Sequence, residues 1–146
     1  MQQEFVLLFS RFPIIILTVG KHSKRKRGGI MCTRSQALDI LATVYQNCNR
    51  IYAGSIQDAI LYGSYARGDN HDASDIDILI TANMTQEQIS SNGKALASLS
   101  SRLGLDYDTV ISIQVVPLAQ FNRYADYLPF YQTVLREGIR YAPIDR

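Results

Sequence analysis

The sequence predicts one domain of the α/β (α+β) class, in which a small mixed sheet of three to five strands is flanked by helices. Segments with apolar residues at helical spacing alternate along the chain with short apolar or β-branched runs typical of strands. Two Thr-x-x-Gln sequences, beginning at Thr33 and Thr85, are capping boxes that mark helix starts. A chain of 146 residues is also long enough to form one domain with a core that needs no disulfides.

The expected elements follow one another without an internal repeat. They are a helix over 34–52, a strand over 56–62, a helical turn over 64–67, a strand over 75–81, a helix from 85 to 103, a strand over 109–116, two helical pieces over 118–137 and a short strand over 139–142. Gly54 and Gly104 are expected to end helices, and Gly93 weakens the helix that contains it. Pro117 closes the third strand, and Pro129 divides the last helical region.

Residues 1–30 differ in composition from the rest of the chain. An apolar run over 5–19, interrupted by one arginine and one proline, precedes a cluster of lysines and arginines. The run is shorter than the roughly 20 residues of a membrane-spanning helix, and a secretory signal has its basic residues before the apolar run. We therefore expect residues 1–30 to be a poorly ordered extension upstream of a natural start at Met31, with the domain over 31–146. A signal anchor and a basic nucleic-acid tail are the alternatives.

The formal net charge of +2 is unevenly distributed. Residues 1–30 hold six basic residues and one acidic residue, whereas residues 31–146 hold nine basic and twelve acidic residues, a net charge of −3. The domain therefore has no basic stripe for a nucleic-acid template, and we expect neither a templated nucleic acid nor a membrane as partner. Cys32 and Cys48 follow no disulfide or metal-binding spacing, which indicates a reducing compartment, most simply the cytoplasm.

The strongest motif lies over 63–77 and reads GSYARG, then five residues, then SDID. Its two aspartates are two residues apart at the start of an expected strand, so their side chains face the same way. Asp75 and Asp77 can therefore bind one Mg²⁺, which proteins hold through carboxylates and substrate phosphates. The turn at Gly63 offers backbone N–H groups to an anion. The pattern predicts a site for a nucleoside triphosphate with its metal ion.

This motif resembles the G-S-x-x-R-G-x(n)-S-D-x-D signature of the DNA polymerase β-like nucleotidyltransferase superfamily, and most closely its minimal nucleotidyltransferase branch. The resemblance is strong over 63–80 and looser from about Met31 to the C-terminus. It implies the polymerase β-like fold. It also implies an in-line displacement at the α-phosphate of a nucleoside triphosphate, expected to be ATP, with pyrophosphate leaving and with two Mg²⁺ ions as cofactors.

We assign nucleotide-binding roles to Gly63, Ser64, Arg67 and Ser74. The resemblance implies that Ser64 offers its hydroxyl and N–H to the terminal phosphates. Arg67 either pairs with phosphate oxygens through its planar guanidinium or holds the aspartates in a structural salt bridge, and both alternatives remain open. Ser74 is expected to brace the turn that precedes the second strand.

The resemblance also implies a third carboxylate on a neighbouring strand, which helps hold the second ion and activates the attacking hydroxyl. Asp108 is the best match because it opens the expected third strand, and Asp106, with the same parity, is the second choice. Ser112 and Gln114 occupy that parity further along the strand, which departs from many relatives. The predicted catalytic and metal-binding residues are Asp75, Asp77 and Asp108.

Together these features predict an enzyme, a Mg²⁺-dependent nucleotidyltransferase that moves a nucleoside monophosphate, AMP from ATP, onto a hydroxyl. The resemblance implies a separately encoded helical partner of the HEPN type. It further implies an antitoxin role in a toxin–antitoxin system, in which a tyrosine of the partner is adenylylated. The alternative is a weakly active or inactive module that neutralises its partner by binding alone, which the uncertain third carboxylate favours.

Overall fold

The computed structural model describes residues 3–9, 12–18 and 32–142, and they form a mixed sheet flanked by helices. The helices are α1 (Arg34–Ile51), α2 (Ser64–Arg67), α3 (Gln86–Ser91), α4 (Gly93–Asp106), α5 (Leu118–Tyr124) and α6 (Pro129–Glu137). The strands are β1 (Gln3–Phe9), β2 (Phe12–Thr18), β3 (Ile56–Tyr62), β4 (Ile76–Ala82), β5 (Ile111–Pro117) and β6 (Ile139–Arg140). The predicted fold class is confirmed, and the predicted strands of residues 56–142 begin and end within two residues of the observed ones.

In the described ranges the sheet has six strands in the order β1-β2-β5-β4-β3-β6. The neighbours β4 and β5 are parallel, and every other described pair is antiparallel. We expected three to five strands, and the excess comes from β1 and β2, which continue the sheet beyond β5. The physical reason is that the edge of β5 presents unpaired backbone groups, and the isoleucine-rich β2 pairs with them. Residues 3–9 and 12–18, which we expected to belong to a poorly ordered extension, thus form strands. Residues 1–2, 10–11 and 19–31 lie outside the described residues, and the domain boundary at Met31 stays a prediction.

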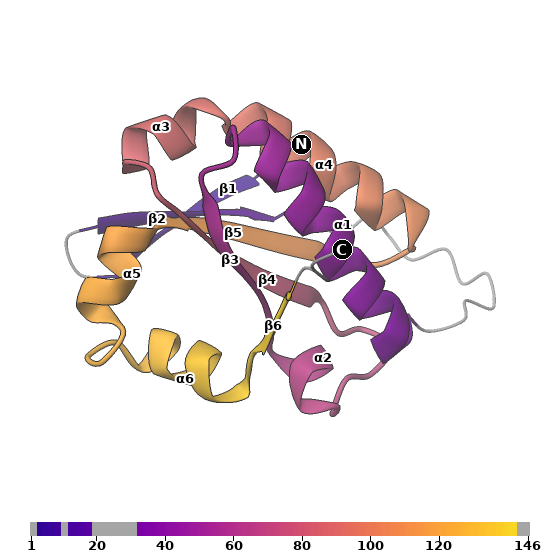
Figure 1. The fold of residues 1–146 in the computed structure, drawn as a ribbon. Helices are drawn as coiled ribbons and strands as arrows, with labels where there is room; N and C mark the ends of the chain where they lie inside the picture. Colours follow the sequence, from indigo (N-terminus) through magenta and orange to yellow (C-terminus); the bar gives the residue numbers. More distant parts are fainter. Residues whose placement is uncertain (1–2, 10–11, 19–31, 143–146) are drawn as a thin grey trace.

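Both faces of the sheet are covered, as Figure 1 shows, with α1, α3 and α4 on one face and α5 and α6 on the other. The larger core lies on the first face and includes Ile76, Ile78 and Ile80 of β4. The smaller core lies on the second face and includes Leu79 of the same strand. This alternation follows from the period of two in a strand. The same alternation determines the face of the sheet on which each polar side chain of β4 lies.

The two predicted capping boxes are present and set the starts of α1 and α3. At α1, the Gln36 N–H donates to Thr33 Oγ1 at 3.1 Å, and the Thr33 N–H donates to Gln36 Oε1 at 2.8 Å. The helix expected over 85–103 is two helices, because Asn92 leaves helical geometry between them and Gly93, with its low helix propensity, follows. The second of them, α4, continues to Asp106 rather than ending at Gly104.

Cys48 is fully buried in α1, where burial raises its pKa to about 12, and Cys32 is buried before the same helix. Neither thiol is in a disulfide. In the part of the chain that the structure describes, no helix combines the length and apolar character needed to cross a bilayer.

Candidate active site

Asp75 and Asp77 lie where β4 begins. Asp77 is the second residue of the strand, and Asp75 immediately precedes it. Ile76 and Ile78, on either side of Asp77, are fully buried in the larger core. Asp77 therefore lies on the opposite face, the face that α5 and α6 cover. Both aspartates are partly buried. The sequence prediction that their side chains share a face stays a prediction.

Asp77 is held in an environment that disfavours its charged form. Burial raises the pKa of its carboxyl group to about 6, the negative charge of Asp75 raises it further, and Arg67 acts in the opposite direction. No hydrogen bond to a described residue contributes to this balance. Two carboxylates that repel one another, with no hydrogen bond from a described residue to Asp77, provide oxygen ligands that suit a hard cation such as Mg²⁺.

Gly63 lies against the Asp77 carboxylate and has an unusual backbone conformation. Its φ of 75° and ψ of −155° belong to a region that is almost restricted to glycine. A Cβ atom at this position would lie 2.7 Å from Oδ2 of Asp77, which is closer than atoms can pack. The missing side chain thus leaves room for the carboxylate beside the turn. The predicted role of this turn in phosphate binding stays a prediction.

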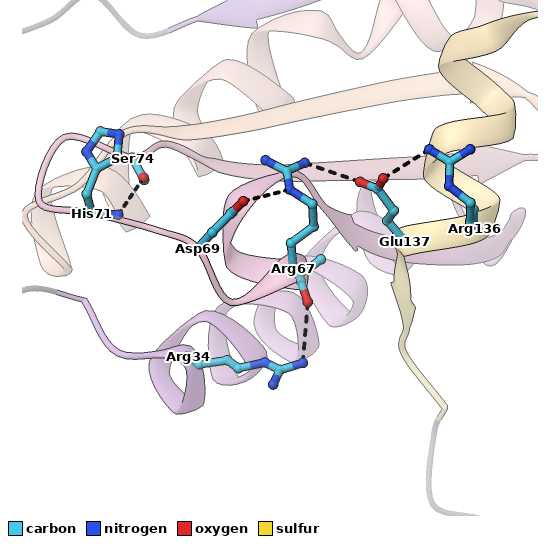
Figure 2. A network of polar contacts seen from close by, with 8 residues as sticks. Arg34, Arg67, Asp69, His71, Ser74, Arg136 and Glu137 are labelled. Carbon is cyan, nitrogen blue, oxygen red and sulfur yellow. Dashed lines mark hydrogen bonds and ion pairs between the residues drawn. The ribbon is translucent and has the colours of Figure 1, made fainter.

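The rest of the motif folds into a short helix and an ordered loop. Ser64 begins α2, and its carbonyl accepts from the N–H groups of Gly68 and Asp69 at 2.8 and 3.1 Å. Further along, Ser74 Oγ accepts from the His71 N–H at 2.8 Å (Figure 2). The Ser74 N–H in turn donates to the His71 carbonyl at 2.8 Å. Ser74 therefore braces the turn before β4, as the sequence predicted.

Arg67 forms two ion pairs, and neither involves the paired aspartates. Its Nε donates to Asp69 Oδ2 at 3.1 Å and its Nη1 donates to Glu137 Oε2 at 3.2 Å, as Figure 2 shows. Glu137 also accepts from Arg136 Nη2 at 3.0 Å, and these two arginines together lower the pKa of Glu137. The structural salt bridge that we considered for Arg67 thus exists with other partners. The Arg67 side chain is 43% exposed, so a ligand can reach it from solvent.

Asp106 and Asp108, the two candidates for a third carboxylate, do not lie at the start of β5. Asp106 is the last residue of α4, and Asp108 is exposed in the following turn with a φ of 49°. The displacement arises because α4 runs on to Asp106 and the chain then turns, with the Thr109 N–H donating to the Gly104 carbonyl. Among the described residues, no three His, Cys, Asp or Glu side chains form a group that could hold a metal ion. The role of Asp108 stays a prediction.

Two residues near the site were missed by the sequence analysis. Tyr62 pairs with Asp77 across β3 and β4, and its ring meets Phe130 of α6 edge-on with centroids 5.5 Å apart. Burial, and then the charge of Asp77, raises the pKa of the Tyr62 hydroxyl. Glu137 is the other, brought to Arg67 from 70 residues away. The alternation of side chains in the strand just before the motif could have indicated that Tyr62 lies near the site. No pattern in the sequence around Glu137 indicates that this residue reaches Arg67.

The fold and this site define a nucleotidyltransferase of the polymerase β-like type. The family model described as "Nucleotidyltransferase domain" matches residues 42–137, so the chain belongs to this family and is a transferase enzyme. It is 38% identical over 87 residues to "Putative protein adenylyltransferase MJ0604" of Methanocaldococcus jannaschii, a match that covers 60% of this chain and 79% of that protein. It is also 32% identical over 78 residues to "Putative protein adenylyltransferase MJ0141" of the same organism, covering 53% of this chain and 76% of that protein.

Proposed function

We propose that this chain is a Mg²⁺-dependent adenylyltransferase that transfers AMP from ATP to a hydroxyl group of another protein. The observation that carries the proposal is the approach of Gly63 to the Asp77 carboxylate, which joins the glycine turn and the aspartate pair in one site. The names of the two relatives support a protein as the acceptor.

Asp75 and Asp77 would hold the ion, because they are the paired carboxylates of the site and no hydrogen bond from a described residue competes for Asp77. When bound, Mg²⁺ supplies positive charge that offsets the charge of the phosphates. Ser64 and the backbone at Gly63 are assigned to the phosphates, and Ser74 holds the loop that leads into β4. Arg67 can contribute its guanidinium by exchanging Asp69 or Glu137 for a phosphate oxygen.

We further propose that the acceptor is a tyrosine of a helical HEPN-type protein encoded next to this chain, which would make the chain an antitoxin. The aspartate pair provides the negatively charged, metal-binding half of such a site. The acceptor hydroxyl would come from the partner.

Label transfer tests the proposal. ATP labelled at the α-phosphate is incubated with Mg²⁺, the chain and the protein of the adjacent gene, and label on the partner is measured. Wild type should label the partner, and Asp77→Asn should not, because the variant loses a charged ligand of the ion. The matched control is Asp39→Asn, which removes an exposed carboxylate of α1 on the other face of the sheet and should label as wild type does. Absence of label with wild type, in a stable complex with the partner, would contradict the transfer reaction.

A second candidate function has its own supporting observation. No third carboxylate joins the aspartate pair among the described residues, and a chain with two carboxylates can bind a nucleotide and an ion yet transfer slowly. In this alternative, the chain neutralises its partner by binding. Complex formation that is unaffected by Asp77→Asn, together with no transfer by wild type, would support it.

A further inference from the structure

The residue beside Asp77 in the neighbouring parallel strand is Ser112. Asp77 of β4 is the register partner of Ser112 of β5, and Leu79 is the partner of Gln114. Register partners in adjacent strands lie about 4.8 Å apart and point to the same face of the sheet. Ser112 is therefore the side chain of β5 that is placed to share a ligand with Asp77.

The side chains of β5 on this face are neutral. Ser112 is 8% exposed and Gln114 is 2% exposed. The Gln114 Oε1 atom is buried and has no hydrogen-bond partner among the described residues. Val116, the next residue on the same face, belongs to the smaller core with Leu79. A hydroxyl and an amide can offer oxygen atoms to an ion, but they bring no negative charge to the side of the site that faces β5.

The acidic residues nearest to β5 in sequence are placed elsewhere. Asp108 precedes Ser112 by four residues and lies in an exposed turn, and Asp106 lies at the end of α4. The Ile76 N–H donates to the Val110 carbonyl at the point where β4 begins. The residues that precede Val110 therefore lie beyond Asp75, outside the paired part of the two strands. Within the described part of the chain, the site accordingly has two carboxylates.

We infer that this site binds a single divalent cation per nucleotide, and that Ser112 is the residue that limits it to one. The inference rests on the proposed function, since it concerns the ion that accompanies ATP. It departs from the pair of ions expected from the sequence. Two dications about 4 Å apart repel one another, and beside the phosphates of the nucleotide the described part of the protein offers only two carboxylates to offset that repulsion. An aspartate at position 112 would supply the missing charge next to Asp77.

Ion counting tests the inference without any transfer reaction. The chain is dialysed to equilibrium against Mn²⁺ and α,β-methylene-ATP, an analogue that cannot transfer AMP, and bound Mn²⁺ and bound nucleotide are measured. Wild type should bind one Mn²⁺ per bound nucleotide. Ser112→Asp should bind two Mn²⁺ ions per nucleotide. Ser112→Asn, whose side chain has the shape of aspartate without its charge, is the control and should bind one. Because an aspartate at a buried position can disturb the fold, each variant is first compared with wild type by thermal unfolding with and without Mn²⁺.

Results that contradict the inference differ from those that contradict the proposed function. Two Mn²⁺ ions per nucleotide in wild type would overturn the inference and leave the proposed function intact, and loss of one ion in Asp108→Asn would then assign that residue as the ligand. One ion in a folded Ser112→Asp variant would overturn the role given to Ser112. No binding of the analogue by wild type would instead contradict the proposed function. The wild-type ratio is decisive even when no variant folds.

Discussion

A Cβ atom placed on Gly63 would lie 2.7 Å from the Oδ2 atom of Asp77. The absence of a side chain at the end of β3 therefore defines the space in which the carboxylate of β4 sits. Gly63 has two independent reasons to be glycine, since its backbone φ of 75° with ψ of −155° is also strained for any other residue.

Gly63→Ala should displace the Asp77 carboxylate and destabilise the fold. We expect a loss of about 1–3 kcal/mol from the backbone conformation alone, and a loss of Mn²⁺ binding because one ligand has moved. Gly54→Ala is the matched control. Gly54 has a similar φ of 76°, but a Cβ atom there meets nothing within 4 Å. Denaturant unfolding and Mn²⁺ titration of both variants check the prediction. Equal Mn²⁺ affinity in the two variants would show that the contact with Asp77 is unimportant.

The contribution of Asp77 to the stability of the metal-free protein should fall as the pH rises from about 4 to about 6. The carboxyl group of Asp77 has an ordinary pKa of 3.8, and burial raises it to about 6 in the folded state. Between these values the folded protein holds a proton that the unfolded chain has released, so deprotonation favours unfolding as the pH increases. Asp77→Asn cannot titrate, and at pH 7 it should be more stable than wild type by an amount on the order of 1–3 kcal/mol.

Urea unfolding at pH 4, 5, 6 and 7, without divalent ions, measures this difference. The two proteins should be nearly equal at pH 4 and should diverge through pH 6. Addition of Mg²⁺ at pH 7 should then stabilise wild type more than the variant. A constant difference between the two proteins at every pH would mean that Asp77 ionises as an ordinary surface carboxyl group does.

The local part of the fold and of the site followed from the sequence. The motif over 63–77 is contiguous: strand parity places Asp75 and Asp77 on one face, and the resemblance of the whole motif to a known signature brings Gly63 into the same site. The capping boxes are local in the same way. The helix start at Thr33 needs only the hydrogen bonds between that residue and Gln36.

What could not be predicted depends on long-range packing. Strand register between β4 and β5 decides that Ser112 lies beside Asp77, and no pattern within either strand encodes this pairing. The turn that carries Asp108 away from β5 depends on how far α4 continues, which is set by packing against the sheet. The ion pair of Arg67 with Glu137 joins residues 70 positions apart. Each of these relations exists only after the chain has folded.

Glu137→Gln should distinguish the two roles of Arg67. If Arg67 binds phosphate, Glu137 competes with the nucleotide for the guanidinium, and its neutralisation should tighten ATP binding a few-fold at low salt, with less effect at high salt. If Arg67 acts only as a structural link between α2 and α6, the same variant should leave ATP affinity unchanged or weaken it. Because the groups are partly exposed, we expect little change in stability.

Equilibrium binding of ATP with Mg²⁺ at two salt concentrations gives the answer. Glu87→Gln removes an exposed glutamate from the first turn of α3 and serves as the charge-matched control. Arg67→Gln completes the set, since phosphate binding predicts weaker affinity in that variant. Unchanged affinity in both Glu137→Gln and Arg67→Gln would assign Arg67 to the structural role.

Gly138 connects α6 to β6, and its substitution should disturb both the fold and the site. A Cβ atom there would collide with the carbonyl oxygen of Val134 and with Cγ2 of Ile60 in the smaller core. Gly138→Ala should therefore cost about 1–3 kcal/mol through overpacking. Because Glu137 precedes this glycine, the displaced backbone should also weaken its ion pair with Arg67.

The matched control for this overpacking is Gly93→Ala, at the start of α4. A Cβ atom at Gly93 meets nothing within 4 Å, and alanine has the higher helix propensity, so this variant should gain up to about 1 kcal/mol. The same chemical change is thus expected to have opposite signs at the two positions, and thermal unfolding of both proteins measures it. Equal stability of the two variants would mean that the junction of α6 and β6 relaxes around the added methyl group without consequence.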